Sequence, residues 1–243
     1  ECPGIFTRFS DYQPRCWKRS GHGSLNVSEA ITNSCNVFFY EVGYQLGLNG
    51  DKYDQDLGNE KLAKYASMYG LNEKSGIEIE ESEPQISDAL SVVSAIGQGT
   101  NNYTVSQINR YVTAVANRGT VYSLSLIDKT TDSNGKLIKD YTPEVVNQMD
   151  EISSSTWDLV HNGMESMVKS SSTFAGMDIS MGGKTGTAQY SKIHADNVLF
   201  VGYAPADSPE ISIAVRIANG YASTYAAEIG RDITKVYFNP ESA

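Results

Sequence analysis

The sequence predicts a single α+β domain. Helical patterns with capping residues fill most of its first half, and strand-like runs gather in its second half. Helices followed by antiparallel strands are typical of the α+β class. No internal repeat, low-complexity tract or linker divides the sequence, so we expect one domain over residues 1–243.

The first elements are an irregular segment and a helix. Residues 1–25 are rich in Gly, Pro and Ser and show no period, which predicts loops. Asn26 and Glu29 then form a capping box ahead of apolar residues at helical spacing. Because Gly47 closes this pattern, we expect one helix over 27–46.

The remaining elements follow in order. Periodic apolar residues between caps and glycines predict four more helices: one that ends at Gly70, one capped by Thr104 and Gln107 that stops before Gly119, one over 154–169 and one over 224–238. Alternating runs predict the strands: two around a hairpin turn at Asn134 and Gly135, then 178–190, 197–205 and 211–220.

Composition restricts the classes of function. With 40% hydrophobic and 20% charged residues, the chain is an ordinary globular protein. Its net charge of −10 argues against nucleic acid and anionic membrane surfaces as partners. No apolar run approaches the roughly 20 residues of a membrane-spanning helix. The chain begins without Met or a leader, so we expect it to be a piece of a longer protein.

The stretch MGGKTGTAQY carries the first chemical motif. On a strand, Lys184 and Gly186 share one face, and Thr185 and Thr187 share the other. Such a strand offers hydroxyls, backbone N–H groups and a positive field to a carboxylate or an oxyanion. The glycines, including those at 182 and 183, would let a ligand or another backbone approach closely. The alternative is a glycine-rich edge strand with a solvated lysine.

A second motif lies in the first expected helix. Ser34 and Asn36 are two residues apart, so they do not face one way on a regular helix. A distorted or terminal turn would aim both at one cleft. The alternative is a pair of polar residues on the flank of a helix.

Together the two motifs resemble a known signature. Ser-x-x-Lys, then Ser-Asp-Asn, then Lys-Thr-Gly is typical of penicillin-binding proteins and class A β-lactamases. The surrounding stretches GHGSLNVSEAITNSCNVFFYEVGYQLG, AIGQG, NGK and GGKTGTAQ…FVGYAP resemble class B penicillin-binding proteins, especially the elongation-type, penicillin-binding protein 2-like transpeptidases. The resemblance runs from about residue 3 to the end. It implies the penicillin-binding transpeptidase and serine β-lactamase-like fold, an antiparallel sheet with helices, incomplete at the N-terminus.

The nucleophile motif of that family does not precede Ser34. One Ser-x-x-Lys runs from Ser133 to Lys136, in the expected hairpin turn, and we interpret it as a chance match. Another runs from Ser166 to Lys169, and it too follows Ser34 in the chain. The Lys-Ser-Gly at 74–76 is interpreted in the same way. We therefore expect the attacking serine and its lysine base to lie upstream of these residues, and this chain alone to be inactive.

The resemblance also implies a role for each motif residue. Ser34 relays a proton between nucleophile and leaving group, Asn36 hydrogen-bonds the acyl-donor amide, and Lys184 supplies positive field. The carboxylate of a D-Ala-D-Ala stem or a β-lactam binds Thr185, Gly186 and Thr187.

The function implied by the resemblance is a serine D,D-transpeptidase that cross-links peptidoglycan stem peptides and is a target of β-lactams. It needs no cofactor for catalysis. It would be extracytoplasmic, anchored in the membrane by an N-terminal segment absent from this chain, and would work with other cell-wall elongation proteins. The alternatives are a β-lactam sensor or β-lactamase relative, and a non-catalytic scaffold domain. An upstream Ser-x-x-Lys would separate the enzyme from the scaffold.

All three cysteines and one of three histidines lie in the first 35 residues: Cys2, Cys16, His22 and Cys35. Four such ligands fit a closed tetrahedral zinc site. The resemblance adds that some elongation-type relatives carry metal-ligand residues at matching places. The alternative is a Cys2–Cys16 disulfide with Cys35 buried in the helix, which an oxidising compartment favours. Structural zinc and disulfide both stay open.

Other polar residues are expected to be structural or solvated. His161 falls in a predicted helix and His194 in a loop between strands. The acidic segment 77–84 is predicted to be a solvated loop, and the turn at 95–99 a structural element near the cleft.

Overall fold

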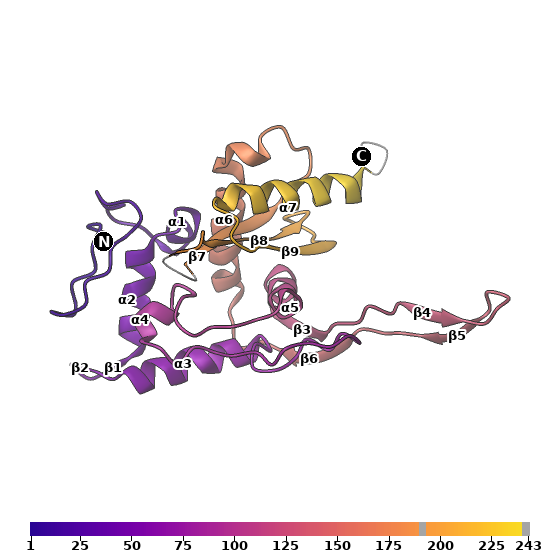
Figure 1. Ribbon diagram of the computed structural model, residues 1–243, viewed down its shortest axis with the longest axis horizontal. Helices are drawn as coiled ribbons and strands as arrows, with labels where there is room; N and C mark the ends of the chain where they lie inside the picture. The colour runs from indigo at the N-terminus through magenta and orange to yellow at the C-terminus, as the bar shows by residue number, and fades with distance from the viewer. Residues whose placement is uncertain (190–192, 240–243) are drawn as a thin grey trace.

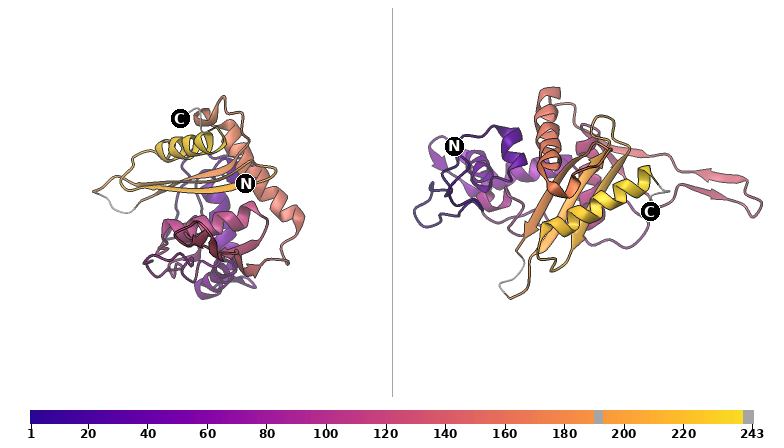
Figure 2. Two further views of the ribbon diagram at one scale, coloured as in Figure 1. Left: turned by 90° about the vertical axis from the view of Figure 1, so that its right-hand side faces the viewer. Right: turned by 90° about the horizontal axis from the view of Figure 1, so that it is seen from above.

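The computed structural model describes residues 1–189 and 193–239 and confirms an α+β fold (Figure 1). At its centre is a three-stranded antiparallel sheet, whose strands in spatial order are β7 (Gly182–Ala188), β8 (Asn197–Ala204) and β9 (Ile211–Ile217). Helix α7 (Ser223–Phe238) covers one face of this sheet. Helix α5 (Val105–Ala116) packs against the other, so the sheet lies between two helical layers (Figure 2).

The other elements surround this centre. The helices are α1 (Val27–Thr32), α2 (Asn36–Leu46), α3 (Gln55–Met68), α4 (Ser91–Ser94), α6 (Ser154–Ser170) and the 3₁₀ turn η1 (Ser172–Phe174). Three two-stranded ladders pair β1 (Leu48–Asn49) with β2 (Lys52–Tyr53), β3 (Thr120–Ser123) with β6 (Glu144–Gln148), and β4 (Lys129–Thr131) with β5 (Leu137–Asp140). Within the described residues, no helix has both the length and the apolar character needed to cross a bilayer.

Most predicted elements are found close to their expected bounds. The helices expected over 154–169 and 224–238 are confirmed as α6 and α7. The strand expected over 178–190 is shorter, because β7 starts only at Gly182. Tyr190, the expected end of that strand, lies outside the described residues.

The single helix predicted over 27–46 is wrong, because the chain turns sharply between α1 and α2. Ser34 adopts a φ of +48°, in the left-handed region, and this conformation ends α1. The N–H of Ser34 donates to Ile31 O and the N–H of Cys35 to Ala30 O. This is the Schellman pattern of a helix end, in which glycine usually takes the left-handed position.

Phe200 of β8 centres the core on the α7 face of the sheet, where it is fully buried. A Cβ at Gly183 would lie 2.8 Å from the Phe200 ring, and one at Gly182 2.3 Å from the Tyr203 ring. The prediction that these two glycines admit a ligand is therefore wrong, since aromatic rings fill the space. At Gly186 a Cβ would meet nothing closer than 3.5 Å, so room remains there.

The predicted hairpin is confirmed as a long arm. Strands β4 and β5 pair around a turn in which Gly135 has a φ of +81° and donates its N–H to Asp132 O. The β3–β6 ladder joins this arm to the body, from which it projects (Figure 1). The Ser-x-x-Lys at Ser133–Lys136 lies in the turn at the tip, which supports its interpretation as a chance match.

The acidic segment 77–84 departs from the prediction at Glu81, whose side chain is buried. Its carboxylate accepts hydrogen bonds from the backbone and hydroxyl of Ser75 and from the hydroxyls of Thr104 and Ser106. Burial acts to raise the pKa of Glu81, but these hydrogen bonds outweigh it and lower the pKa. Glu81 thus fixes the segment to the first turn of α5.

The two histidines expected to be structural or solvated behave as predicted. His161 is buried in α6, and its Nε2 lies 2.8 Å from Val115 O. His194 is exposed. Gly97 and Gly99 both take left-handed conformations in the turn that follows α4.

Candidate active site

Two segments far apart in the sequence meet at the predicted site, namely the turn between α1 and α2 and strand β7. The Lys184 ammonium donates hydrogen bonds to Ser34 Oγ and, at 2.8 Å, to Thr185 O. An ammonium group has no acceptor capacity, so Ser34 Oγ is the acceptor. The hydroxyl proton of Ser34 therefore remains available to a ligand.

Lys184 is partly buried, and burial lowers its pKa to about 8. Removal from water disfavours the charged form of an amine. At neutral pH the ammonium still predominates, so the site holds a positive charge in a poorly solvated place. Such a charge acts more strongly on a developing oxyanion than it would in water.

The other predicted ligand-binding groups are uncommitted. Among the described residues, the Asn36 side chain and the hydroxyls of Thr185 and Thr187 have no hydrogen-bond partner. Asn36 is the first residue of α2, and Thr187 lies on the exposed part of β7. These groups are free to bind a ligand.

Strand β7 also offers its backbone. It pairs with β8 on one side, and its other side pairs with no strand among the described residues. An open strand edge can accept an extended peptide as an additional strand. Lys184 and Gly186 lie on this edge strand beside the Ser34 turn, which makes it suited to a peptide substrate.

We expect Ser34→Gly and Ser34→Ala to have different effects on stability. The left-handed conformation costs roughly 1–2 kcal/mol for a residue with a Cβ, and glycine avoids that cost. Glycine should therefore give the more stable variant by about 1 kcal/mol, although both lose the hydroxyl. Denaturant unfolding measures the difference. An alanine variant as stable as the glycine variant would contradict the strained turn.

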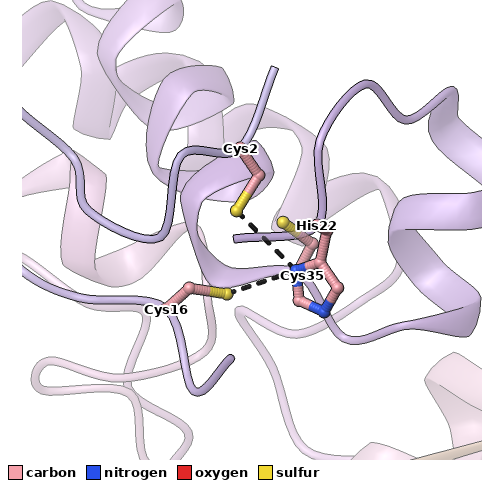
Figure 3. Close-up of side chains that lie close together, drawn as sticks. All are labelled: Cys2, Cys16, His22 and Cys35. Atoms are coloured by element: carbon pink, nitrogen blue, oxygen red, sulfur yellow. Dashed lines mark hydrogen bonds between the residues drawn. The ribbon is translucent and has the colours of Figure 1, made fainter. Parts of the chain in front are cut away.

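The four predicted metal ligands converge (Figure 3). Their ligand atoms all lie within 4.8 Å of one another, and the three cysteines are buried. Nδ1 of His22 lies 3.7 Å from Cys2 Sγ and 3.5 Å from Cys16 Sγ. The three thiols are free, so the Cys2–Cys16 disulfide is not formed in this structure.

This arrangement fits a zinc ion. Tetrahedral Zn–S and Zn–N bonds of about 2.3 and 2.0 Å place sulfur and nitrogen ligands roughly 3.5 Å apart, close to the observed separations. Burial raises the pKa of Cys35 to about 12, so a cation would be needed to hold that thiolate. Nε2 of His22 is buried without a hydrogen-bond partner in the described part of the chain, although a zinc-bound histidine usually donates from that nitrogen.

Cys35 connects this cluster to the active-site turn. It lies between Ser34 and Asn36 and is the N-cap residue of α2. Its side chain points into the cluster, whereas the hydroxyl of Ser34 contacts Lys184. A group that binds Cys35 would therefore restrain the turn that carries Ser34 and Asn36.

Sequence reasoning missed one residue that contacts this turn. Trp17 Nε1 donates hydrogen bonds of 3.0 Å to Asn33 O and 3.1 Å to Ser34 O. Trp17 belongs to an irregular segment without periodicity. Nothing in its local sequence indicates that its ring reaches a turn 16 residues away.

A helix-end serine that meets the lysine of a Lys-Thr-Gly edge strand matches two of the three motifs that penicillin-binding proteins and class A β-lactamases share. Residues 6–235 match the penicillin-binding protein transpeptidase domain. The chain belongs to this family, and the predicted fold is confirmed.

Individual relatives agree with this assignment. The chain is 32% identical over 241 residues to stage V sporulation protein D of Bacillus subtilis, covering 91% of this chain and 35% of that protein. It is 26% identical over 276 residues to the peptidoglycan D,D-transpeptidase MrdA of Haemophilus influenzae, covering 98% and 39%. The solved structure of penicillin-binding protein 2B from Streptococcus pneumoniae matches with a TM-score of 0.77 and 26% identity, covering 89% and 40%. The chain thus spans 35% to 40% of the length of these proteins.

Proposed function

We propose that this chain is the C-terminal part of a D,D-transpeptidase domain that cross-links peptidoglycan stem peptides and is acylated by β-lactams. The contact between Lys184 and Ser34 beside the open edge of β7 carries this proposal. It brings a serine hydroxyl and an ammonium together beside an open strand edge, which supports the proposed roles of proton relay, positive field and peptide binding. The name of the Haemophilus influenzae relative agrees with this activity.

The substrate would be an extended peptide that ends in D-Ala-D-Ala. Its backbone would pair with β7 as an added strand, since that edge is open among the described residues. Its terminal carboxylate would bind Thr185 and Thr187, whose hydroxyls lack other partners there. The amide of Asn36 would hydrogen-bond the acyl-donor peptide. A β-lactam carboxylate would bind in the same way.

The attacking serine and its lysine base would come from sequence upstream of residue 1. In acylation, the oxygen of that serine bonds to the substrate carbonyl carbon, and the C–N bond to the leaving amine breaks. Ser34 would give its hydroxyl proton to the amine and accept the proton of the nucleophile. The Lys184 charge would stabilise the developing negative charge. The amine of a second stem peptide then bonds to the carbonyl carbon, the bond to the serine oxygen breaks, and the amine proton returns to that oxygen; no cofactor takes part.

This proposal predicts how penicillin labels the protein. The chain alone should not be labelled by a fluorescent penicillin, because we place the nucleophile upstream of residue 1. The same chain joined to its upstream sequence should acquire a label that survives boiling in detergent. Labelling of the chain alone would show that the nucleophile lies within residues 1–243. An extended protein that stays unlabelled would support a scaffold without activity.

We also propose a setting and a structural metal. The whole protein would be extracytoplasmic, anchored by an upstream membrane segment, and would act with other cell-wall elongation proteins. Cys2, Cys16, His22 and Cys35 would hold a zinc ion, a proposal supported by their convergence. With four protein ligands the metal has no open position for water, so its role would be structural.

A further inference from the structure

Trp17 makes an unusual contact for an exposed tryptophan. Its side chain is 60% exposed, yet its indole N–H points at the backbone of the active-site turn. Its one N–H is shared between Asn33 O and Ser34 O, a three-centre hydrogen bond. No other donor among the described residues reaches either carbonyl.

This donor adds to the Schellman hydrogen bonds that already hold the turn. Asn33 and Ser34 follow the last residue of α1, where carbonyl groups lack partners within the helix. Ser34 is also held in a left-handed conformation that a serine does not favour. A donor that binds both carbonyls favours this conformation over extended alternatives. It thereby sets the direction of the Ser34 side chain.

Burial contributes little to the role of Trp17. The residue is 60% exposed, and the aromatic ring that it meets is that of His22, edge-on with centroids 5.2 Å apart. By contrast, Trp157 of α6 is only 3% exposed and belongs to a core cluster. Core packing therefore explains Trp157 but leaves the position of Trp17 unexplained.

We propose that Trp17 is a positioning residue for the transpeptidase reaction, acting through Ser34. Its indole N–H holds the left-handed turn so that the Ser34 hydroxyl meets the Lys184 ammonium. Trp17 itself touches neither substrate nor nucleophile in this role. The inference rests on the proposed function, because it assigns Trp17 to the same proton relay.

The test is Trp17→Phe in the full-length protein, which keeps an aromatic ring and removes the N–H. Acylation by a fluorescent penicillin is followed by rapid mixing, so that the limiting acylation rate and the apparent Kd are measured separately. The limiting rate should fall roughly tenfold, the scale for losing one hydrogen bond that aligns a reacting group. The apparent Kd and the melting temperature should change little, because the ring is exposed.

Trp157→Phe is the matched control, since it alters the only other tryptophan. It should lower the melting temperature and leave the acylation rate per folded molecule unchanged. In a Ser34→Ala background, Trp17→Phe should cause no further loss of the residual acylation rate, because the two residues act in series.

Three results would overturn the proposal. The first is an unchanged acylation rate in Trp17→Phe. The second is a fall in acylation rate on Trp17→Phe that is as large in the Ser34→Ala background as in the wild type, and the third is a Trp17→Phe protein that fails to fold. The last would show that the exposed ring stabilises the domain as a whole. A wild-type protein that is not acylated would instead contradict the proposed function.

Discussion

Replacing Lys184 with alanine in the full-length protein should slow acylation by penicillin at least ~10²-fold, the usual scale for losing one pre-organised electrostatic group. The ammonium contacts Ser34 Oγ directly, so its removal takes away both the charge and the partner that orients the relay hydroxyl. The measurement is the second-order rate of labelling by a fluorescent penicillin. Unchanged labelling would remove Lys184 from the site.

Two further measurements separate the effect of the Lys184 charge on acylation from a general loss of protein stability. Lys169→Ala, which removes an exposed lysine of α6 paired with Glu165, should label at the wild-type rate. The second measurement is the acylation rate as a function of pH. Burial places the pKa of Lys184 at about 8, so the ammonium is lost as pH rises through that value. Acylation should therefore decline above about pH 8 in the wild type, and the alanine variant should lose this decline.

Local signals in the sequence predicted much of the fold. The capping box of Thr104 and Gln107 marks the start of α5, and both of its hydrogen bonds are present. The Asn134-Gly135 pair marks the turn of the β4–β5 arm, since glycine there takes a left-handed conformation. Such signals work because the interactions involve residues three or four apart, which the sequence displays directly.

The departures depend on contacts between distant residues. Ser34 takes a conformation that serine disfavours, and its contacts beyond the local Schellman hydrogen bonds are with Trp17 and with the distant Lys184. Glu81 looks like its solvated acidic neighbours, and its burial depends on hydroxyls of the first turn of α5. No local pattern encodes these contacts, so sequence reasoning extended a helix through the turn and left Glu81 in solvent.

The contact of Ser34 with Lys184 and the convergence of the Cys/His cluster agree with the sequence motifs, whereas the backbone turn that brings Ser34 to Lys184 was not predicted. Lys184, Ser34 and Asn36 belong to motifs whose residue types are dictated by chemistry. The convergence of the three cysteines and His22 followed from the preference of zinc for thiolate and imidazole ligands. The nucleophile could be expected only from the family resemblance, and its place upstream remains a prediction.

The second large effect we expect is that of metal removal. A structural zinc contributes its binding free energy to folding, and this amounts to about 10–16 kcal/mol in isolated zinc fingers. This domain also has a hydrophobic core, so we expect metal binding to add only part of that free energy to its stability. A loss of about 4 kcal/mol would already lower the melting temperature by roughly 10 °C in a domain of this size. Chelation should therefore lower the melting temperature by at least ~10 °C.

Metal loss should also harm acylation, but only through the turn. Cys35 is the ligand that joins the cluster to Ser34 and Asn36, so its release loosens both. Cys35→Ser should reproduce the lower melting temperature, and chelator should then have little further effect on that variant. A chelator that destabilises wild type and Cys35→Ser equally would argue against metal at this cluster.

Elemental analysis of protein purified without added metal decides between the two interpretations of the cysteines. About one zinc per chain, with three free thiols on denaturation, is the expected result. A protein without metal and with a single free thiol would instead contain a Cys2–Cys16 disulfide. In that case Cys35, which belongs to the active-site turn, would be the free thiol and would bind no metal. The turn would then depend on Trp17 and on the Schellman hydrogen bonds of α1.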